Sequence, residues 1–337
     1  MEVTFHERQM AQHFLLSAKA RTLNLATVMR MTDLQAEQVF ADIRWVETEG
    51  KAVCPHCDCR TCYPARRPNG ALRFRCKACR KDFSLTSGTL FAFHKMPLRQ
   101  YLAAIVIFCN EVKGKSALAL SRDLGTQYKT AFVLAHKLRE AMASEVKSHR
   151  LGGAGKTVEI DGGYFGGYIK PANHKEYRRD RRLAKNQNGK RQCVVVIRER
   201  DGAVLPAAFR SERDALSFIR NRVARETEIM VDESPAWNDL HTGYAVKTIN
   251  HQLAYSDQGA CTNGAESFFS RMRRAENGHH HHIAGVYLGR YAQESAWRED
   301  ARRVDNGRQV RAVAGLALKA RPSVDFCGYW QRNETAA

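Results

Sequence analysis

The chain has 337 residues, enough for two or three domains, and its hydrophobic and charged fractions of 44% and 26% are typical of a globular protein. Its formal charge of +19 is unusual. The first 50 residues hold five Lys or Arg against seven Asp or Glu, a net of −2, so the remainder carries +21. This excess favours a polyanionic partner such as a nucleic acid over an acidic or neutral one.

A membrane protein or a secreted protein is not expected. The longest apolar run, Tyr101 to Cys109, is far too short to span a bilayer, and residues 1–10 lack the regions of a signal peptide. Ten cysteines without a secretion signal favour a reducing compartment, where paired cysteines bind metals more often than they form disulfides. We therefore expect a cytoplasmic protein with no membrane partner.

The expected elements follow the chain in four blocks. Residues 1 to about 50 are predicted to be helical, with Met31 to Trp45 the clearest amphipathic segment and Asp33 its N-cap. Residues 97–147 are predicted to form two or three helices. Beyond them, strands are predicted at 157–161, 192–200, 203–209, 228–232 and 246–250, and helices at 213–225, 235–241 and 263–275. A poorly marked helix and an aromatic tail follow from residue 303.

Four cysteines have the spacing of a structural zinc site. Cys54 and Cys57 form one C-x2-C pair, and Cys76 and Cys79 form a second after an eighteen-residue gap. Two such pairs supply four thiolates for tetrahedral Zn²⁺, with no open position for catalysis. Cys59 and Cys62 form an overlapping third pair. These two cysteines are either spare thiols or part of a shifted ligand set.

A helix-turn-helix is predicted between residues 115 and 139. A short helix ends at Gly125 and a second helix follows. The small core between them would be filled by Leu120, Leu124, Ala131 and either Val133 or Leu134. The residues at the head of the second helix would meet DNA: Thr126, Gln127, Tyr128 and Lys129. A helical hairpin with a glycine turn and no DNA contact is the alternative.

Three acids have the pattern of a two-metal site. Asp161 and Asp232 each close a strand-like run, and the glycines after Asp161 suggest a tight turn near a ligand. On a predicted helix, Asn263, Glu266 and Arg273 share one face, opposite the apolar residues Ala265, Phe268, Phe269 and Met272. Carboxylates that a sheet and a helix bring together can hold two Mg²⁺ ions for phosphoryl transfer.

Several motifs in this order resemble the ISXO-type family of DDE transposases of bacterial insertion sequences. The resemblance covers residues 50 to 300 and rests on CPHC (54–57), CKAC (76–79), FSLTSGTLF (83–91), YKTAFVLAHKLREAM (128–142), VEIDGGYFGG (158–167), VDESPAW (231–237), NHQLAYSD (250–257), TNGAESFFSRMRR (262–274) and GRYAQESAWR (289–298). Two departures stand out, because Gly162 follows the first aspartate where the family often has an acid and Arg273 replaces a common lysine.

The resemblance implies a multidomain α+β chain: a helical segment (1–50), a zinc ribbon (51–94), a helix-turn-helix region (95–150), a catalytic domain (151–302) and a C-terminal helix and tail (303–337). The catalytic domain would have an RNase-H-like mixed five-stranded sheet flanked by helices. Asp161, Asp232 and either Glu266 or Asn263 would hold Mg²⁺ or Mn²⁺. Charge favours Glu266, since an amide offers only a neutral carbonyl. Arg273 would hold a phosphate.

The implied function is a DNA transposase, associated with the bacterial nucleoid, that cuts terminal inverted repeats and joins them to target DNA as a dimer or larger synaptic complex. Two alternatives remain: a non-catalytic DNA-binding regulator derived from a transposase, and an RNase-H-like nuclease. The insert from Tyr168 to Arg191 holds nine Lys or Arg against two Asp or Glu, a net of +7, and would grip DNA without reading its sequence. Its candidate contacts are Arg178, Arg179, Arg181 and Arg182. A solvated loop is the alternative.

Overall fold

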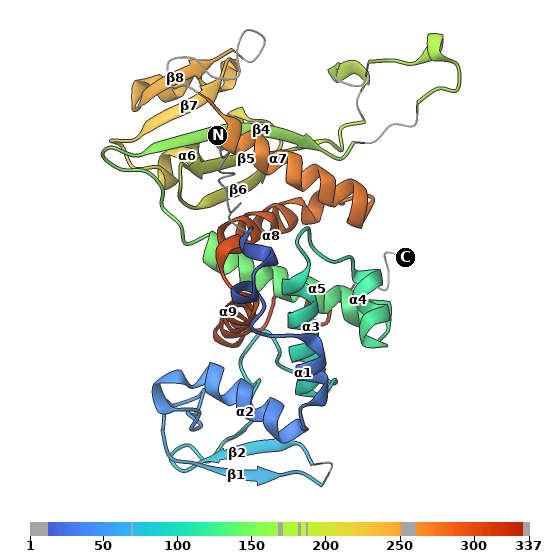
Figure 1. Cartoon of the computed structure of the whole chain (residues 1–337), viewed down its shortest axis with the longest axis vertical. Coiled ribbons are helices and arrows are strands. Elements are labelled where there is room, and N and C mark those ends of the chain that lie inside the picture. The colour runs from blue at the N-terminus through green and yellow to red at the C-terminus, as the bar shows by residue number, and fades with distance from the viewer. Residues whose placement is uncertain are drawn as a thin grey trace, which may run out of the picture.

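The computed structural model describes residues 13–68, 70–167, 171–180, 183–186, 188–250 and 261–332. It is elongated, with a small sheet at one end, a helical body in the middle and a larger sheet at the other end (Figure 1). This is the mixed α+β, multidomain architecture that the sequence predicts. No helix among the described residues is long and apolar enough to cross a membrane.

The small sheet packs against the helix that precedes it. Helices α1 (Leu25–Arg30) and α2 (Asp33–Arg44) lead into the antiparallel strands β1 (Cys62–Arg66), β2 (Leu72–Cys76) and β3 (Asp82–Phe83). Trp45, at the end of α2, meets Phe74 and Phe83 edge-on, with ring centroids 5.4 and 6.5 Å apart. These contacts make Trp45, Phe74 and Phe83 part of a buried core that is continuous with that of the helices.

The predicted N-cap of α2 is wrong by one residue. Thr32 is the N-cap, and its hydroxyl accepts the backbone N–H of Gln35 at 3.2 Å. The Gln35 side chain accepts the backbone N–H of Thr32 in return, at 2.8 Å. This reciprocal capping box satisfies two helix-end donors, whereas Asp33 stands inside the helix, where its charge favours the N-terminal dipole.

The helical body joins distant parts of the chain. Helix α5 (Tyr128–Val146) packs against α4 (Ala117–Leu124), α8 (Leu288–Asp300) and α9 (Asn306–Lys319), and α9 also packs against α2 and α3 (Leu98–Asn110). Helix α9 is the segment that the sequence marked poorly, and it is a full helix capped by Asp305. The C-terminal part of the chain therefore completes the core of the N-terminal half, ending in α10 (Tyr329–Arg332).

The larger sheet has five strands in the order β6-β5-β4-β7-β8. Strands β4 (Thr157–Phe165), β5 (Gln192–Glu199) and β6 (Val204–Phe209) are antiparallel, whereas β7 (Glu228–Asp232) and β8 (Ala245–Ile249) run parallel to β4. Helix α6 (Leu216–Arg222) connects β6 to β7, and a 3-10 helix (Pro235–Thr242) precedes β8. Helix α7 (Asn263–Ala275) packs on β4 and β5, and α8 packs on β5 and β6.

The predicted turn after Asp161 is wrong. Strand β4 continues to Phe165, and Gly162 and Gly163 pair with β5 inside it. Both glycines instead allow side chains from other elements to lie close to β4. A Cβ on Gly162 would lie 2.4 Å from the Glu212 side chain, and one on Gly163 would lie 2.5 Å from the Phe269 ring. Consecutive residues face opposite sides of a strand, so Phe269 of α7 and Glu212 cover opposite faces of β4.

A buried glutamate joins the helical body to the sheet end. Glu294 of α8 pairs with Arg139 of α5 (Oε2 to Nε, 2.6 Å) and with Arg298 (Oε1 to Nη2, 2.7 Å). Arg298 also donates to the carbonyl of Phe108 in α3 at 2.8 Å. Burial acts to raise the pKa of Glu294, but the charges of Arg139 and Arg298 outweigh it and lower the pKa to about 2.

Replacing this carboxylate should unfold the body readily. Glu294→Gln leaves the Arg139 and Arg298 guanidinium groups buried without a counter-charge, so we expect a loss of about 3–5 kcal/mol in the free energy of unfolding. The exposed Glu47→Gln is the control. Urea unfolding measures both. Because the pKa of Glu294 is lowered in the fold, the loss should be full above pH 4.5 and shrink as the pH falls towards 2; an equal loss in the control would contradict this role.

Candidate functional site

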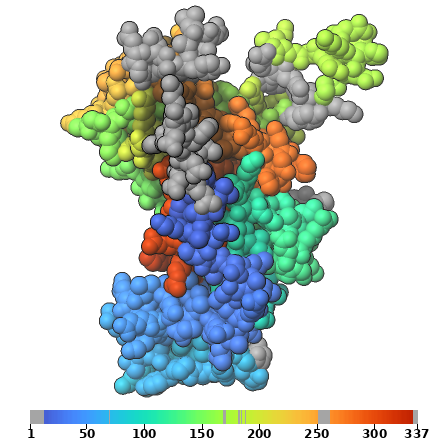
Figure 2. All heavy atoms as spheres, viewed as in Figure 1, coloured from blue at the N-terminus to red at the C-terminus, as the bar shows by residue number. Residues whose placement is uncertain are grey.

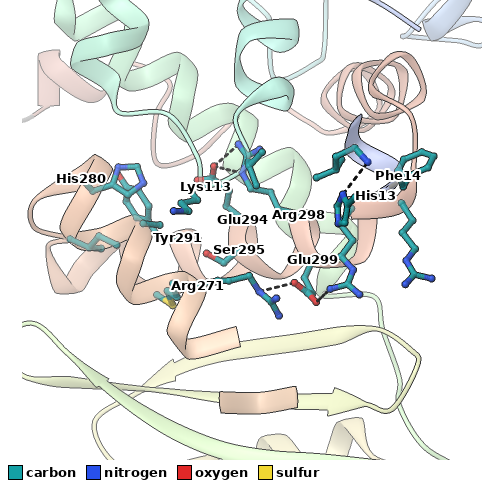
Figure 3. A pocket seen from close by; sticks show the side chains of 17 residues that line it. His13, Phe14, Lys113, Arg271, His280, Tyr291, Glu294, Ser295, Arg298 and Glu299 are labelled. Carbon is teal, nitrogen blue, oxygen red and sulfur yellow. Dashed lines mark hydrogen bonds and ion pairs between the residues drawn. The ribbon is translucent and has the colours of Figure 1, made fainter. Parts of the chain in front are cut away.

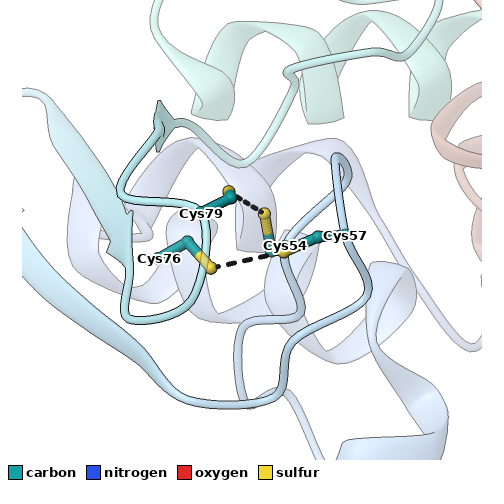
Figure 4. A group of neighbouring side chains, drawn as sticks. All are labelled: Cys54, Cys57, Cys76 and Cys79. Carbon is teal, nitrogen blue, oxygen red and sulfur yellow. Dashed lines mark hydrogen bonds between the residues drawn. The ribbon is translucent and has the colours of Figure 1, made fainter.

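The four predicted zinc ligands lie together in the small module. The sulfur atoms of Cys54, Cys57, Cys76 and Cys79 are all within 4.8 Å of one another (Figure 4). Cys54 is 3.6 Å from Cys79, and Cys57 is 3.6 Å from Cys76. Tetrahedral Zn²⁺ with Zn–S bonds of about 2.3 Å requires sulfurs roughly 3.8 Å apart. The donors and their spacing therefore fit a four-thiolate Zn²⁺ site.

The overlapping third pair does not join this cluster. The thiol of Cys59 donates to the carbonyl of Thr61 at 3.6 Å, and the thiol of Cys62 donates to the carbonyl of Cys59 at 3.5 Å. The geometry therefore favours the unshifted ligand set, with Cys59 and Cys62 as spare thiols.

Two of the predicted catalytic acids lie on neighbouring strands of the larger sheet. Glu159 of β4 is paired with Met230 of β7 in a parallel register, so Asp161 and Asp232, two residues further on, lie level and share a face. Asp232 accepts the indole N–H of Trp237 at 2.7 Å. Burial first, and then the charge of Asp232, raise the pKa of Asp161 to about 7. Adjacent carboxylates with little compensating positive charge suit a divalent cation.

The third acid approaches from helix α7. The predicted apolar face of this helix is confirmed, because Ala265, Phe268, Phe269 and Met272 are buried. Glu266 lies in the first turn of α7, is exposed to solvent, and its charge further raises the pKa of Asp161. In the part of the chain that the structure describes, only the four cysteines bring three or more ligand atoms within 4.8 Å of one another. The three acids are therefore spaced more widely than the thiols.

Two other polar residues of α7 were singled out from the sequence. Asn263 is exposed and is the first residue of the helix, so it is not the N-cap; that position is held by Thr262. Arg273 is exposed, and its guanidinium carbon lies 5.8 Å from the centre of the Phe165 ring and 6.0 Å from that of Phe269. These rings hold the Arg273 side chain near the β4 end that follows Asp161.

A fourth acid, Glu212, was missed in the sequence. Glu212 lies behind Gly162, on the opposite face of β4 from Phe269, and its carboxylate accepts the hydroxyl hydrogen of Ser234 at 2.9 Å. Burial raises its pKa, and the charge of Asp232 adds to this shift. No strand-end or helical pattern marks Glu212, but the double glycine after Asp161 was a signal that side chains cross that strand closely.

The predicted DNA-contacting residues occupy two surfaces. At the start of α5, Gln127, Tyr128 and Lys129 are exposed and Thr126 is partly buried. The tail covers part of this surface: Trp330 donates its indole N–H to the carbonyl of Lys129 at 3.2 Å, and the Lys129 ammonium lies 5.1 Å from its ring centre. Further along α5, Leu134, and not Val133, is buried in the hairpin core.

The basic insert stands away from the sheet, as the described residues 171–180 and 183–186 show (Figures 1 and 2). Arg178 and Arg179 are exposed, and Arg178 donates to the carbonyls of Ala172 and Asn173 at 3.1 and 3.3 Å. Arg181 and Arg182, and residues 251–257 of the NHQLAYSD motif, lie outside the described residues.

A cavity of about 650 Å³ lies between α7, α8 and residues 13–15 (Figure 3). Among its arginines, Arg298 pairs with Glu294, and Arg271 and Arg302 both pair with Glu299 (Arg271 Nε to Oε2, 2.9 Å). None of the three predicted catalytic acids lines it. The cavity is therefore separate from the candidate active site.

A four-thiol ribbon followed by an RNase-H-like sheet with acids on its first and fourth strands defines the class of zinc-ribbon DDE transposases. Comparison with family models agrees: an ISXO2-like transposase domain matches residues 150–300, and a transposase zinc-ribbon domain matches residues 31–82. The chain therefore carries an ISXO2-like transposase domain and a transposase zinc-ribbon domain. The ribbon match includes α2, in keeping with the packing of Trp45 on the ribbon. A search of curated proteins finds no match.

The ribbon cysteines can be tested by metal content. Purified protein should carry one Zn²⁺, and Cys76→Ser should lose it because three thiolates cannot close the site. Cys59→Ser is the matched control, since this thiol bonds only a nearby carbonyl. Atomic emission after dialysis measures zinc per chain. Full zinc in Cys76→Ser together with loss in Cys59→Ser would show that the shifted ligand set is the correct one.

The raised pKa of Asp161 predicts a pH-dependent stability. Its folded value of about 7 exceeds the ordinary 3.8, so ionising Asp161 destabilises the fold increasingly between pH 4 and 7 and fully above pH 7. Without added divalent cations, Asp161→Asn should stabilise the protein at pH 8 by on the order of 2 kcal/mol and much less at pH 4.5. Thermal unfolding measures it, with the exposed Asp239→Asn as control. A gain that does not change with pH would refute the shift.

Proposed function

We propose that this chain is a DNA transposase of an insertion sequence, which cuts the terminal inverted repeats of its element and joins the freed ends to target DNA. The observation that carries the proposal is the placement of Asp161 and Asp232 at one level of adjacent parallel strands, beneath the helix that bears Glu266. The match to the ISXO2-like transposase domain supports the same reaction class.

The three carboxylates would hold the divalent cations. Their oxygens are the donors that Mg²⁺ and Mn²⁺ prefer. Burial and the charge of Asp232 raise the pKa of Asp161, and a bound cation would favour its ionised form. When bound, the cations would activate the attacking hydroxyl and stabilise the leaving oxygen. Asp232 is oriented by the Trp237 indole. Arg273, held beside Phe165 and Phe269, would bind a phosphate of the DNA.

DNA binding is proposed for three parts of the chain. The ribbon and the exposed start of α5, at Gln127, Tyr128 and Lys129, would find the inverted repeats. The insert, with its net charge of +7, would hold the backbone without reading sequence, since phosphate contacts are independent of base identity. Two element ends must be cut together, so a dimer or larger synaptic complex is proposed.

Cleavage assays test this proposal, with DNA substrates that end in inverted repeats identified on either side of the gene. Asp161→Asn, Asp232→Asn and Glu266→Gln should each lower Mg²⁺-dependent cleavage by about 100-fold or more while binding of the end sequence is retained. Asn263→Ala should lose less than about tenfold, because its neutral amide is the weaker cation ligand. Nicking of labelled DNA and fluorescence anisotropy give the two measurements.

The rival functions give other outcomes. Binding without cleavage in the wild-type protein would identify a regulator, and cleavage without joining of 3′ ends to target DNA would identify a nuclease. Normal cleavage by Glu266→Gln together with loss in Asn263→Ala would make Asn263 the third ligand.

A further inference from the structure

Glu159 is a buried acid that the proposed reaction does not use. It lies on β4, two residues before Asp161, and only 4% of it is exposed. Its Oε2 accepts the backbone N–H of Gly264 at 2.7 Å and that of Ala265 at 3.1 Å, both in the first turn of α7. Its Oε1 accepts Nε–H of Arg200 at 3.1 Å. A carboxylate from the sheet therefore caps the helix that carries Glu266.

The helix has no equivalent cap of its own. Thr262 is the N-cap of α7 and makes no side-chain capping hydrogen bond. The first N–H groups of a helix need acceptors, and an anion there also favours the helix dipole. The approach is so close that a Cβ on Gly264 would lie 2.6 Å from Oε2 of Glu159. Arg198 of β5 adds a second tie, donating to the carbonyl of Gly264 at 3.1 Å.

Two contacts with β4 flank the acids. Glu159, Asp161 and Gly163 share one face of the strand, because side chains alternate along it. Glu159 binds the α7 N-terminus, and the ring of Phe269 rests on Gly163. Asp161 lies between these two attachment points on the strand, and Glu266 lies between them on the helix. The separation of Asp161 and Glu266 is thus set by contacts on either side of both.

We propose that Glu159 is a positioning residue: it anchors the N-terminus of α7 to β4 and thereby holds Glu266 at the distance from Asp161 that a shared cation needs. This inference rests on the proposed function for the role of Glu266, whereas the anchoring itself does not. Glu159 touches neither substrate nor cation in this role and acts through Glu266.

A double-mutant cycle on cation affinity tests the role. In zinc-loaded protein, Mn²⁺ binding is followed by electron paramagnetic resonance for wild type, Glu159→Ala, Glu266→Gln and the double variant. Glu159→Ala should weaken Mn²⁺ binding about tenfold in the wild-type background and less than about twofold in the Glu266→Gln background. Glu159→Gln should recover part of the affinity, since its carbonyl can still accept the helix N–H groups.

The matched control is Glu228→Ala, which removes a glutamate of the neighbouring strand β7 that pairs with Lys247 rather than with α7. It should leave Mn²⁺ affinity unchanged. An equal loss from Glu159→Ala in both backgrounds, or no loss in either, overturns the inference, because a general structural role would not depend on Glu266.

Hydrogen exchange separates the inference from the proposed function. Residues 263–275 should exchange faster in Glu159→Ala than in wild type or Glu228→Ala, with or without Mn²⁺. If wild-type protein binds no Mn²⁺ outside the ribbon, the proposed function fails, and exchange alone then decides the anchoring. Unchanged exchange across 263–275 overturns the inference whatever the Mn²⁺ result.

Discussion

The pairing of one buried carboxylate with two arginines joins the helix that packs on the larger sheet to the rest of the helical body. Glu294 sits on α8, which packs on the sheet, and its partner Arg139 sits on α5 in the helical body. Arg298 extends the contact to the end of α3. Burying these charges is unfavourable unless each is paired and hydrogen-bonded, so the network fixes one arrangement of the helices. The acid-bearing sheet and the helices proposed to bind DNA are therefore joined through a buried, paired charge network.

That connection limits how α5 can meet DNA. Most of the helix is buried against α4, α8 and α9, and His136 in its middle stacks on Phe326 with ring centroids 4.7 Å apart. Only the first turn and the exposed edge remain for recognition, and Trp330 already contacts Lys129 there. The second helix of the hairpin thus serves chiefly as a core helix of the body. Any reading of bases has to come from its N-terminal end or from the ribbon, because the insert is proposed to hold only the DNA backbone.

Local patterns carried much of the fold and the site. Paired C-x2-C spacing predicted the thiol cluster, because each pair lies in a tight turn whose shape depends mainly on residues nearby in the chain. Alternating and helical periodicities placed the five strands and α7 within a few residues, because each of these elements buries one face. The patterns failed at Asp33 and after Asp161. The N-cap of α2 depends on Gln35, three residues after Thr32. The path of β4 after Asp161 depends on side chains from other elements.

By itself, the sequence determined the class of the protein: a basic chain with a four-cysteine ribbon, a five-stranded sheet and acids at strand and helix positions typical of DDE transposases. Tertiary structure decided how those acids are held. Glu159 binds the start of α7, Glu212 fills the space behind Gly162, and Glu294 joins the two halves. Each contact joins residues at least 50 positions apart in the chain. A single acid also produces no periodic pattern from which its partner could be predicted. Only the folded arrangement of β4, α5, α7 and α8 brings their partners within hydrogen-bonding distance.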